Sequence, residues 1–91
     1  MIPERPRQRP GLTARTVGGE TILLDRVTNQ VHQLNVTASF VWQRCDGEHT
    51  GPDIAEALLG AYDVDPLTAR DAVVGTLHQL NELGLLGPAQ D

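Results

Sequence analysis

The chain has 91 residues, a formal net charge of −5 and a hydrophobic content of 40%, which suits one small domain that buries roughly 60% of its unfolded surface. Its single cysteine excludes a disulfide within the chain. No apolar run approaches the length of a membrane span, and the first residues lack the apolar core of a signal peptide, so we expect a cytoplasmic protein that contacts no membrane.

Residues 1–11 contain three prolines and almost no apolar residue beyond Ile2. Such a segment buries too little surface to offset its ordering entropy, and we expect a flexible N-terminal arm. Its arginines, Arg5, Arg7 and Arg9, could hold an acidic partner, although a solvated tail is the commoner meaning of this pattern. The folded domain is expected over residues 12–87, with residues 88–91 frayed at the C-terminus.

Three strands are predicted from β-branched and apolar runs at residues 12–17, 20–27 and 30–34. Gly18-Gly19 and Thr28-Asn29 separate them as tight turns, which predicts an antiparallel meander. In the third strand, alternation places His32 and Leu34 on one face and Val31 and Gln33 on the other.

Apolar residues recur at helical spacing after Asn35, a good N-cap. The first helix is expected to end at Asp46-Gly47. One face of it carries Ala38, Val41, Trp42 and Cys45. We expect Trp42 to be buried against the sheet and the third helix.

Two more helices follow in the pattern. Thr50 or Gly51 is expected to cap the second, and Asp65-Pro66 to start a third that runs to about Leu83. The predicted fold class is α+β, a three-stranded antiparallel sheet followed by three helices. The third helix has a broad apolar arc, which either packs on two neighbours or partly lines a groove.

Catalytic and metal-binding patterns are not found in the sequence. His32, His49 and His78 fall in three different elements without ligand spacing, and the lone Cys45 has no motif that names a base for it. We therefore expect no metal, no cofactor and no enzymatic activity. Cys45 is better interpreted as a small core residue.

A three-helix domain with a small sheet could also be a winged-helix DNA-binding regulator. Its third helix would read the DNA, yet that helix carries Arg70 as its only fixed cation, and the chain has no lysine. DNA readers contact several phosphates with basic side chains, so we expect no nucleic-acid partner. An unrelated protein interaction module is a further alternative. A free third strand beside an apolar helix instead suits strand addition by an extended peptide.

The sequence L-N-V-T-A at residues 34–38, followed by V-W-Q-R-C-D-G at 41–47, resembles the PqqD family, also called RiPP recognition elements. The resemblance extends over about residues 12–86. Further matching elements are Thr50, Asp53-Ile54-Ala55, Tyr62-Asp63-Val64, Asp71-Ala72-Val73 and Leu80-x-x-Leu83-Gly84-Leu85-Leu86.

The resemblance implies a winged-helix-like fold that binds the leader segment of a ribosomally made precursor peptide and delivers it to a modifying enzyme, commonly a radical SAM protein. It also implies a peptide site made by the third strand and the third helix. On this chain the residues are Gln30, Val31, His32, Gln33, Leu34, Arg70, Val73, Val74 and Leu77. The family residue after Asp71 is often Val, whereas here it is Ala72, which leaves the peptide-facing register of the helix open by one residue. The same free strand could pair two copies as a homodimer.

Overall fold

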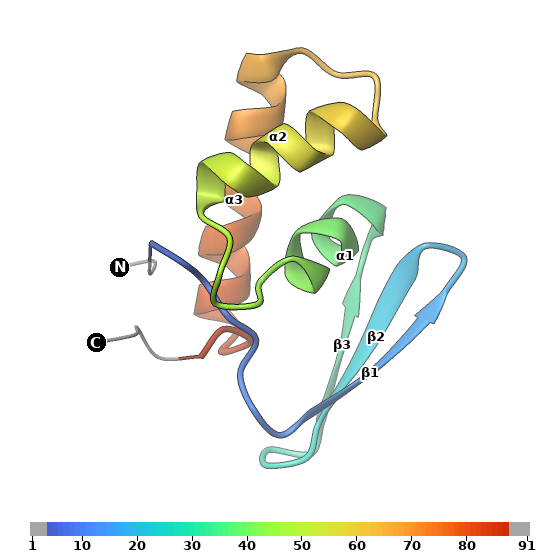
Figure 1. Ribbon diagram of the computed structural model, residues 1–91. Helices are drawn as coiled ribbons and strands as arrows, with labels where there is room; N and C mark the ends of the chain where they lie inside the picture. Colours follow the sequence, from blue (N-terminus) through green and yellow to red (C-terminus); the bar gives the residue numbers. More distant parts are fainter. Residues whose placement is uncertain (1–3, 88–91) are drawn as a thin grey trace.

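The computed structural model describes residues 4–87 as three strands followed by three helices (Figure 1). The predicted α+β class and element order are confirmed. Residues 88–91, expected to be frayed, and the first three residues of the expected arm lie outside the described part. Among the described residues, no helix has the length and apolar character needed to cross a bilayer. The elements are β1 (Leu12–Val17), β2 (Glu20–Asp25), β3 (Gln30–Leu34), α1 (Val36–Gln43), α2 (Gly51–Ala61) and α3 (Pro66–Glu82).

The sheet is an antiparallel meander in the order β1-β2-β3, as predicted. Gly18 and Gly19 form the first hairpin turn, with φ of 60° and 84°. Backbone positions with such positive φ angles favour glycine, which explains why a pair of glycines connects the two strands. Leu23 on β2 is fully buried and faces the helices, whereas Ile22 and Leu24 face away from them.

The second strand is shorter than the expected 20–27. Asp25 ends it, because its carboxylate oxygen Oδ1 accepts hydrogen bonds from the N–H groups of Val27 (3.0 Å) and Thr28 (3.2 Å). An Asp side chain that bonds to the backbone two and three residues ahead turns the chain. The turn therefore spans residues 26–29, and Asn29 takes a φ of 61° before β3 begins.

The first helix begins where predicted, since Asn35 Oδ1 accepts from the Ala38 N–H at 2.8 Å. It ends at Gln43, three residues before the expected Asp46-Gly47 stop. Gly47 does adopt a positive φ of 82°, but in the loop after the helix. Its N–H donates to the Pro6 carbonyl (2.9 Å), so that glycine serves a long-range contact in place of a helix cap.

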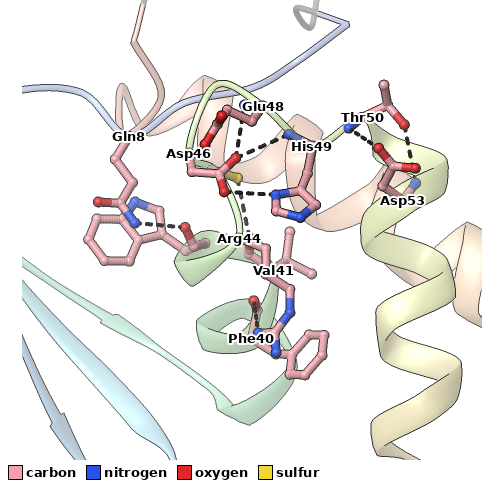
Figure 2. Close-up of polar contacts among 11 residues, drawn as sticks. Gln8, Phe40, Val41, Arg44, Asp46, Glu48, His49, Thr50 and Asp53 are labelled. Atoms are coloured by element: carbon pink, nitrogen blue, oxygen red, sulfur yellow. Dashed lines mark hydrogen bonds and ion pairs between the residues drawn. The ribbon is translucent and has the colours of Figure 1, made fainter.

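Side-chain caps fix the starts of the other two helices. Thr50 and Asp53 form a reciprocal capping box at α2 (Figure 2), and Asp65 Oδ1 accepts from Thr68 N–H (2.8 Å) at α3. The loop between α1 and α2 is held by Asp46, whose carboxylate accepts from the Glu48 and His49 N–H groups and contacts His49 Nδ1 (Figure 2). The expected helix boundaries at Thr50 and Asp65 are confirmed.

One hydrophobic core joins the inner face of the sheet to all three helices. Trp42 lies in it with 5% of its surface exposed, which confirms its expected burial. Leu85 and Leu86 fold back into the core after Gly84 takes a φ of 74°. The larger core residues are Leu23, Leu34, Val41, Trp42, Ile54, Leu58, Val73, Leu77, Leu80, Leu85 and Leu86.

Residues 6–9 differ from the flexible arm expected over residues 1–11. Pro6 is buried, and backbone bonds join Gln8 N–H to the Cys45 carbonyl (2.9 Å) and Arg9 N–H to the Leu85 carbonyl (3.2 Å). The Gln8 side chain also donates to the Trp42 carbonyl (3.0 Å; Figure 2). Hydrogen bonds to distant residues order this segment with Pro6 as its buried apolar side chain, which is why composition alone missed it.

Candidate functional site

The outer edge of β3 is the first part of the candidate site. Within residues 4–87, β3 pairs with β2 alone, so one of its edges has no strand partner. An unpaired edge presents a row of backbone N–H and C=O groups that can bond to another extended chain. The strand covers the predicted residues Gln30, Val31, His32, Gln33 and Leu34.

The hydrogen-bond pattern decides which β3 residues face that edge. The N–H of Arg26 donates to the Gly11 carbonyl (3.1 Å), so the backbone of residue 26 faces β1. The carbonyl of Asp25 accepts from the Asn29 N–H (2.7 Å), so the backbone of residue 25 faces β3. In antiparallel strands successive residues bond to opposite sides. Within β2, the residues that bond to β3 are therefore Thr21, Leu23 and Asp25.

Their partners on β3 are Leu34, His32 and Gln30. Val31 and Gln33 then direct their N–H and C=O groups away from the sheet, to the open edge. A peptide strand would meet two donors and two acceptors from these two residues. Their side chains share the solvent face of the sheet, where Val31 is 65% exposed.

The inner face of β3 points toward the helices, as alternation predicted. Leu34 is buried in the core, and His32 is half-buried beside the open edge. His32 Nε2 and Trp42 Nε1 are buried without a hydrogen-bond partner within residues 4–87. Gln33 donates through its side-chain amide to Glu20 Oε1 (3.0 Å) on the opposite face.

The predicted α3 residues lie in two different environments. Val73 and Leu77 are core residues with 1% and 4% of their surface exposed. Arg70 and Val74 are exposed and, with Val73, line a cleft of about 440 Å³ against α2. Every residue of that cleft belongs to α2 or α3, and none to β3. The structure therefore brings Arg70, Val73 and Val74 together but does not join them to the strand.

Another flank of α3 carries Ala72. At one end, Ala72 shares a cleft of about 230 Å³ with Thr37, in the α1 turn that directly follows β3. At the other end, Arg9 donates through Nε to the Gly84 carbonyl (2.6 Å) and through Nη2 to Asp25, the β2 partner of Gln30. α3 and β3 run in opposite directions (Figure 1), and Arg9 connects the segment after α3 to Asp25 at the end of β2.

The row Ala72, Thr76, Gln79 and Leu83 follows helical spacing on this flank, one residue out of step with the buried stripe. Ala72 and Thr76 are half-buried, and Leu83 is 42% exposed. This row differs from the α3 residues that the family resemblance implies, Arg70, Val73, Val74 and Leu77. The resemblance left the peptide-facing register of α3 open by one residue at Ala72, and Ala72 is the first residue of this row.

Chemical groups for catalysis are not found at this site. Burial raises the pKa of the Cys45 thiol to about 12, with Asp46 adding to the effect, and Cys45 Sγ donates to the Val41 carbonyl. A thiol in that state is not a nucleophile near neutral pH. No group of three or more His, Cys, Asp or Glu side chains within residues 4–87 could hold a metal ion.

A comparison with protein families matches residues 20–86 to the model of "Coenzyme PQQ synthesis protein D (PqqD)". The matched segment holds β2, β3 and all three helices. No curated protein sequence matches the chain significantly.

Two solved structures have a similar fold, each with a TM-score of 0.79. "Lasso peptide synthetase B1 complexed with the leader peptide" is 28% identical, and the match covers 92% of this chain and 99% of that one. "TbiB1 in Complex with the TbiA(beta) Leader Peptide" is 21% identical and covers 93% and 99%.

Proposed function

The chain belongs to the PqqD family, and from this premise we propose that it binds the leader segment of a ribosomally made precursor peptide in natural-product biosynthesis. The observation that carries the proposal is the open edge of β3, where Val31 and Gln33 direct their backbone groups outward. The leader adds there as a fourth strand of the sheet.

Contacts between the leader's side chains and α3 supply most of the affinity in this proposal. Four backbone hydrogen bonds contribute about 1 kcal/mol each, whereas a micromolar complex needs about 8 kcal/mol beyond its ordering costs. The inward side chains of the leader therefore pack between β3 and the α3 flank of Ala72, Thr76, Gln79 and Leu83. His32, half-buried at this edge, lies next to their path.

The partners follow from this role. We propose that the chain catalyses no step itself and hands the bound leader to a modifying enzyme, of which a radical SAM protein is the type we propose. Because ribosomes make the precursor, the encounter takes place in the cytoplasm. The same open edge could pair two free copies, and leader binding would compete with that homodimer.

The test is calorimetry with the synthetic leader of the precursor peptide encoded beside this chain, on wild type and on Gln33→Pro. Proline removes the outward N–H of Gln33 and places its ring at the open edge. On an edge strand a proline whose missing N–H faces solvent is tolerated, so the fold should persist. We expect micromolar binding by wild type and at least a tenfold loss in the variant.

The matched control is Ala14→Pro at the other edge of the same sheet. By the same alternation, Ala14 directs its N–H away from β2, so the two prolines make equivalent changes at the two edges. Ala14→Pro should bind the leader as wild type does. Equal binding by folded Gln33→Pro would contradict strand addition at β3.

A further inference from the structure

The solvent face of the sheet is unusually apolar for a surface that no helix covers. We call it the outer face and define it by Arg15, Val17, Ile22, Leu24, Val31 and Gln33, which the strand register places on one side. Ile22, Leu24 and Val31 are 41%, 37% and 65% exposed, and Val17 is 61% exposed. Apolar side chains grouped in this way on a surface mark an interaction site.

The outer face is continuous with the peptide edge. Val31 and Gln33 belong to both, because their side chains point outward while their backbone groups face the open edge. A leader strand added there must place alternate side chains on the same outer face. The bound peptide would therefore widen the apolar surface by one strand.

The face alone is too small for a stable complex. Three strands at a spacing of about 4.8 Å, each some 20 Å long, give roughly 300 Å². Stable interfaces bury about 800 Å² on each partner, so neither a homodimer nor a permanent complex would form on this face by itself. A partner needs the added peptide strand and further contacts around it.

Charge indicates the chemistry of that partner. The chain as a whole has a net charge of −5, yet the outer face carries Arg15 beside Ile22, and Arg26 reaches it through a contact of Nη1 with Thr13 Oγ1 (3.4 Å). Glu20, which pairs with Val17 beside this face, is an acidic side chain there and accepts from the Gln33 amide, so the two arginines outnumber it. A complementary surface would be apolar with acidic residues at its rim.

We propose that the outer face, extended by the bound leader, is the docking surface for the peptide-modifying enzyme. This inference rests on the proposed function and adds the surface that the enzyme recognises. The enzyme then contacts both this protein and the bound leader. Leader binding therefore strengthens enzyme binding, and enzyme binding strengthens leader binding by the same factor. This protein without a bound leader would compete only weakly with the leader complex for the enzyme.

The test uses the modifying enzyme and the leader encoded beside this chain. Ile22→Asp and Leu24→Asp place a charge on the outer face, and Leu67→Asp, at a 66% exposed apolar position on α3, is the matched control. For wild type and for Leu67→Asp, we expect the leader to raise enzyme affinity at least tenfold. The two outer-face variants should bind the leader with unchanged affinity, but the leader should no longer raise their affinity for the enzyme.

Several outcomes would overturn the proposal. If folded Ile22→Asp and Leu24→Asp, loaded with leader, bind the enzyme as tightly as wild type, the enzyme docks elsewhere. If wild type sediments as a dimer that Ile22→Asp dissociates, a second copy covers the face. If wild type does not bind the leader at all, the proposed function fails as well, and calorimetry without the enzyme reveals that case separately.

Discussion

The guanidinium of Arg9 contacts the buried carboxylate of Asp25, and the same arginine donates to the carbonyl of Gly84. One side chain from the N-terminal segment thereby joins the end of β2 to the end of α3. Asp25 is also the register partner of Gln30 on β3. The contact therefore helps to position the strand of the proposed site.

The Asp25 carboxylate gives a prediction about acid stability. Burial would raise its pKa, but the N–H groups of Thr28 and Val27 and the charge of Arg9 outweigh burial and hold the pKa below its usual value. A carboxyl with a lowered folded pKa stabilises the fold fully above its unfolded pKa of about 4 and loses that contribution as pH falls further. In urea titrations between pH 6 and pH 3, Asp25→Asn should be less stable than wild type at pH 6, and the difference should shrink toward pH 3. A constant difference would contradict this.

Trp42 should dominate the core. We expect Trp42→Ala to cost about 3–5 kcal/mol of unfolding free energy, a large part of the stability of a small domain. Trp42→Phe should cost much less, because it keeps an aromatic ring and removes an indole N–H that has no partner in the described residues. Chemical denaturation measures both. Equal losses for the two variants would contradict an aromatic ring at this position as the source of the stability.

Two substitutions on α3 decide which flank meets the leader. Thr76→Asp places a charge on the α3 flank that we propose packs against the leader, and Val74→Asp places one in the cleft with α2. Since a charge that loses water on docking is costly, Thr76→Asp should weaken leader binding at least tenfold. Val74→Asp should change it less than about twofold. The reverse result in calorimetry would place the peptide at Arg70, Val73, Val74 and Leu77, as the sequence predicts.

Cys45 should react only when the domain opens. With a pKa of about 12 and almost no exposed surface, its thiol should resist a disulfide reagent at pH 8 in the native state. Denaturant should make it react at the rate of a free thiol. Rapid native labelling, measured by absorbance, would contradict the tight packing of the α1 end.

Duplex DNA should not bind measurably at about 0.15 M salt. The exposed side of α3 offers Arg70 against Asp71 and Glu82, and nonspecific binders with many basic contacts reach only about 10⁻⁴–10⁻⁶ M under such conditions. Fluorescence anisotropy with a labelled duplex tests this. Micromolar binding that weakens steeply with salt would favour the winged-helix regulator.

Local signals were enough to predict most of the fold. The helix starts could be predicted from short-range capping bonds of Asn35, Thr50 and Asp65. The first hairpin could be predicted from Gly18-Gly19. Each of these features depends only on residues nearby in the chain. The strand positions and the faces of β3 follow from alternation in the same way.

The misses depend on contacts between distant residues. The end of α1 and the ordering of residues 6–9 are set by bonds to segments far along the chain, such as Gly47 to Pro6. The α3 residues of the site came from the family resemblance, and two of them, Val73 and Leu77, are core residues here. Which flank of α3 faces a peptide at β3 depends on how α3 packs on α1 and α2, and no periodicity contains that information.

The two ends of the described chain also close on each other. Gly87 donates its N–H to the Arg7 carbonyl (2.7 Å), and Gln8 pairs with Leu86. The fold is thus nearly a ring, and a short linker could join residue 87 to residue 7 while new termini are opened at Gly18-Gly19. Such a circular permutant would keep β3 and its open edge intact. Because residues 7 and 87 lie next to each other, this domain could also be inserted into a surface loop of another protein through these two ends, with the open edge of β3 left free.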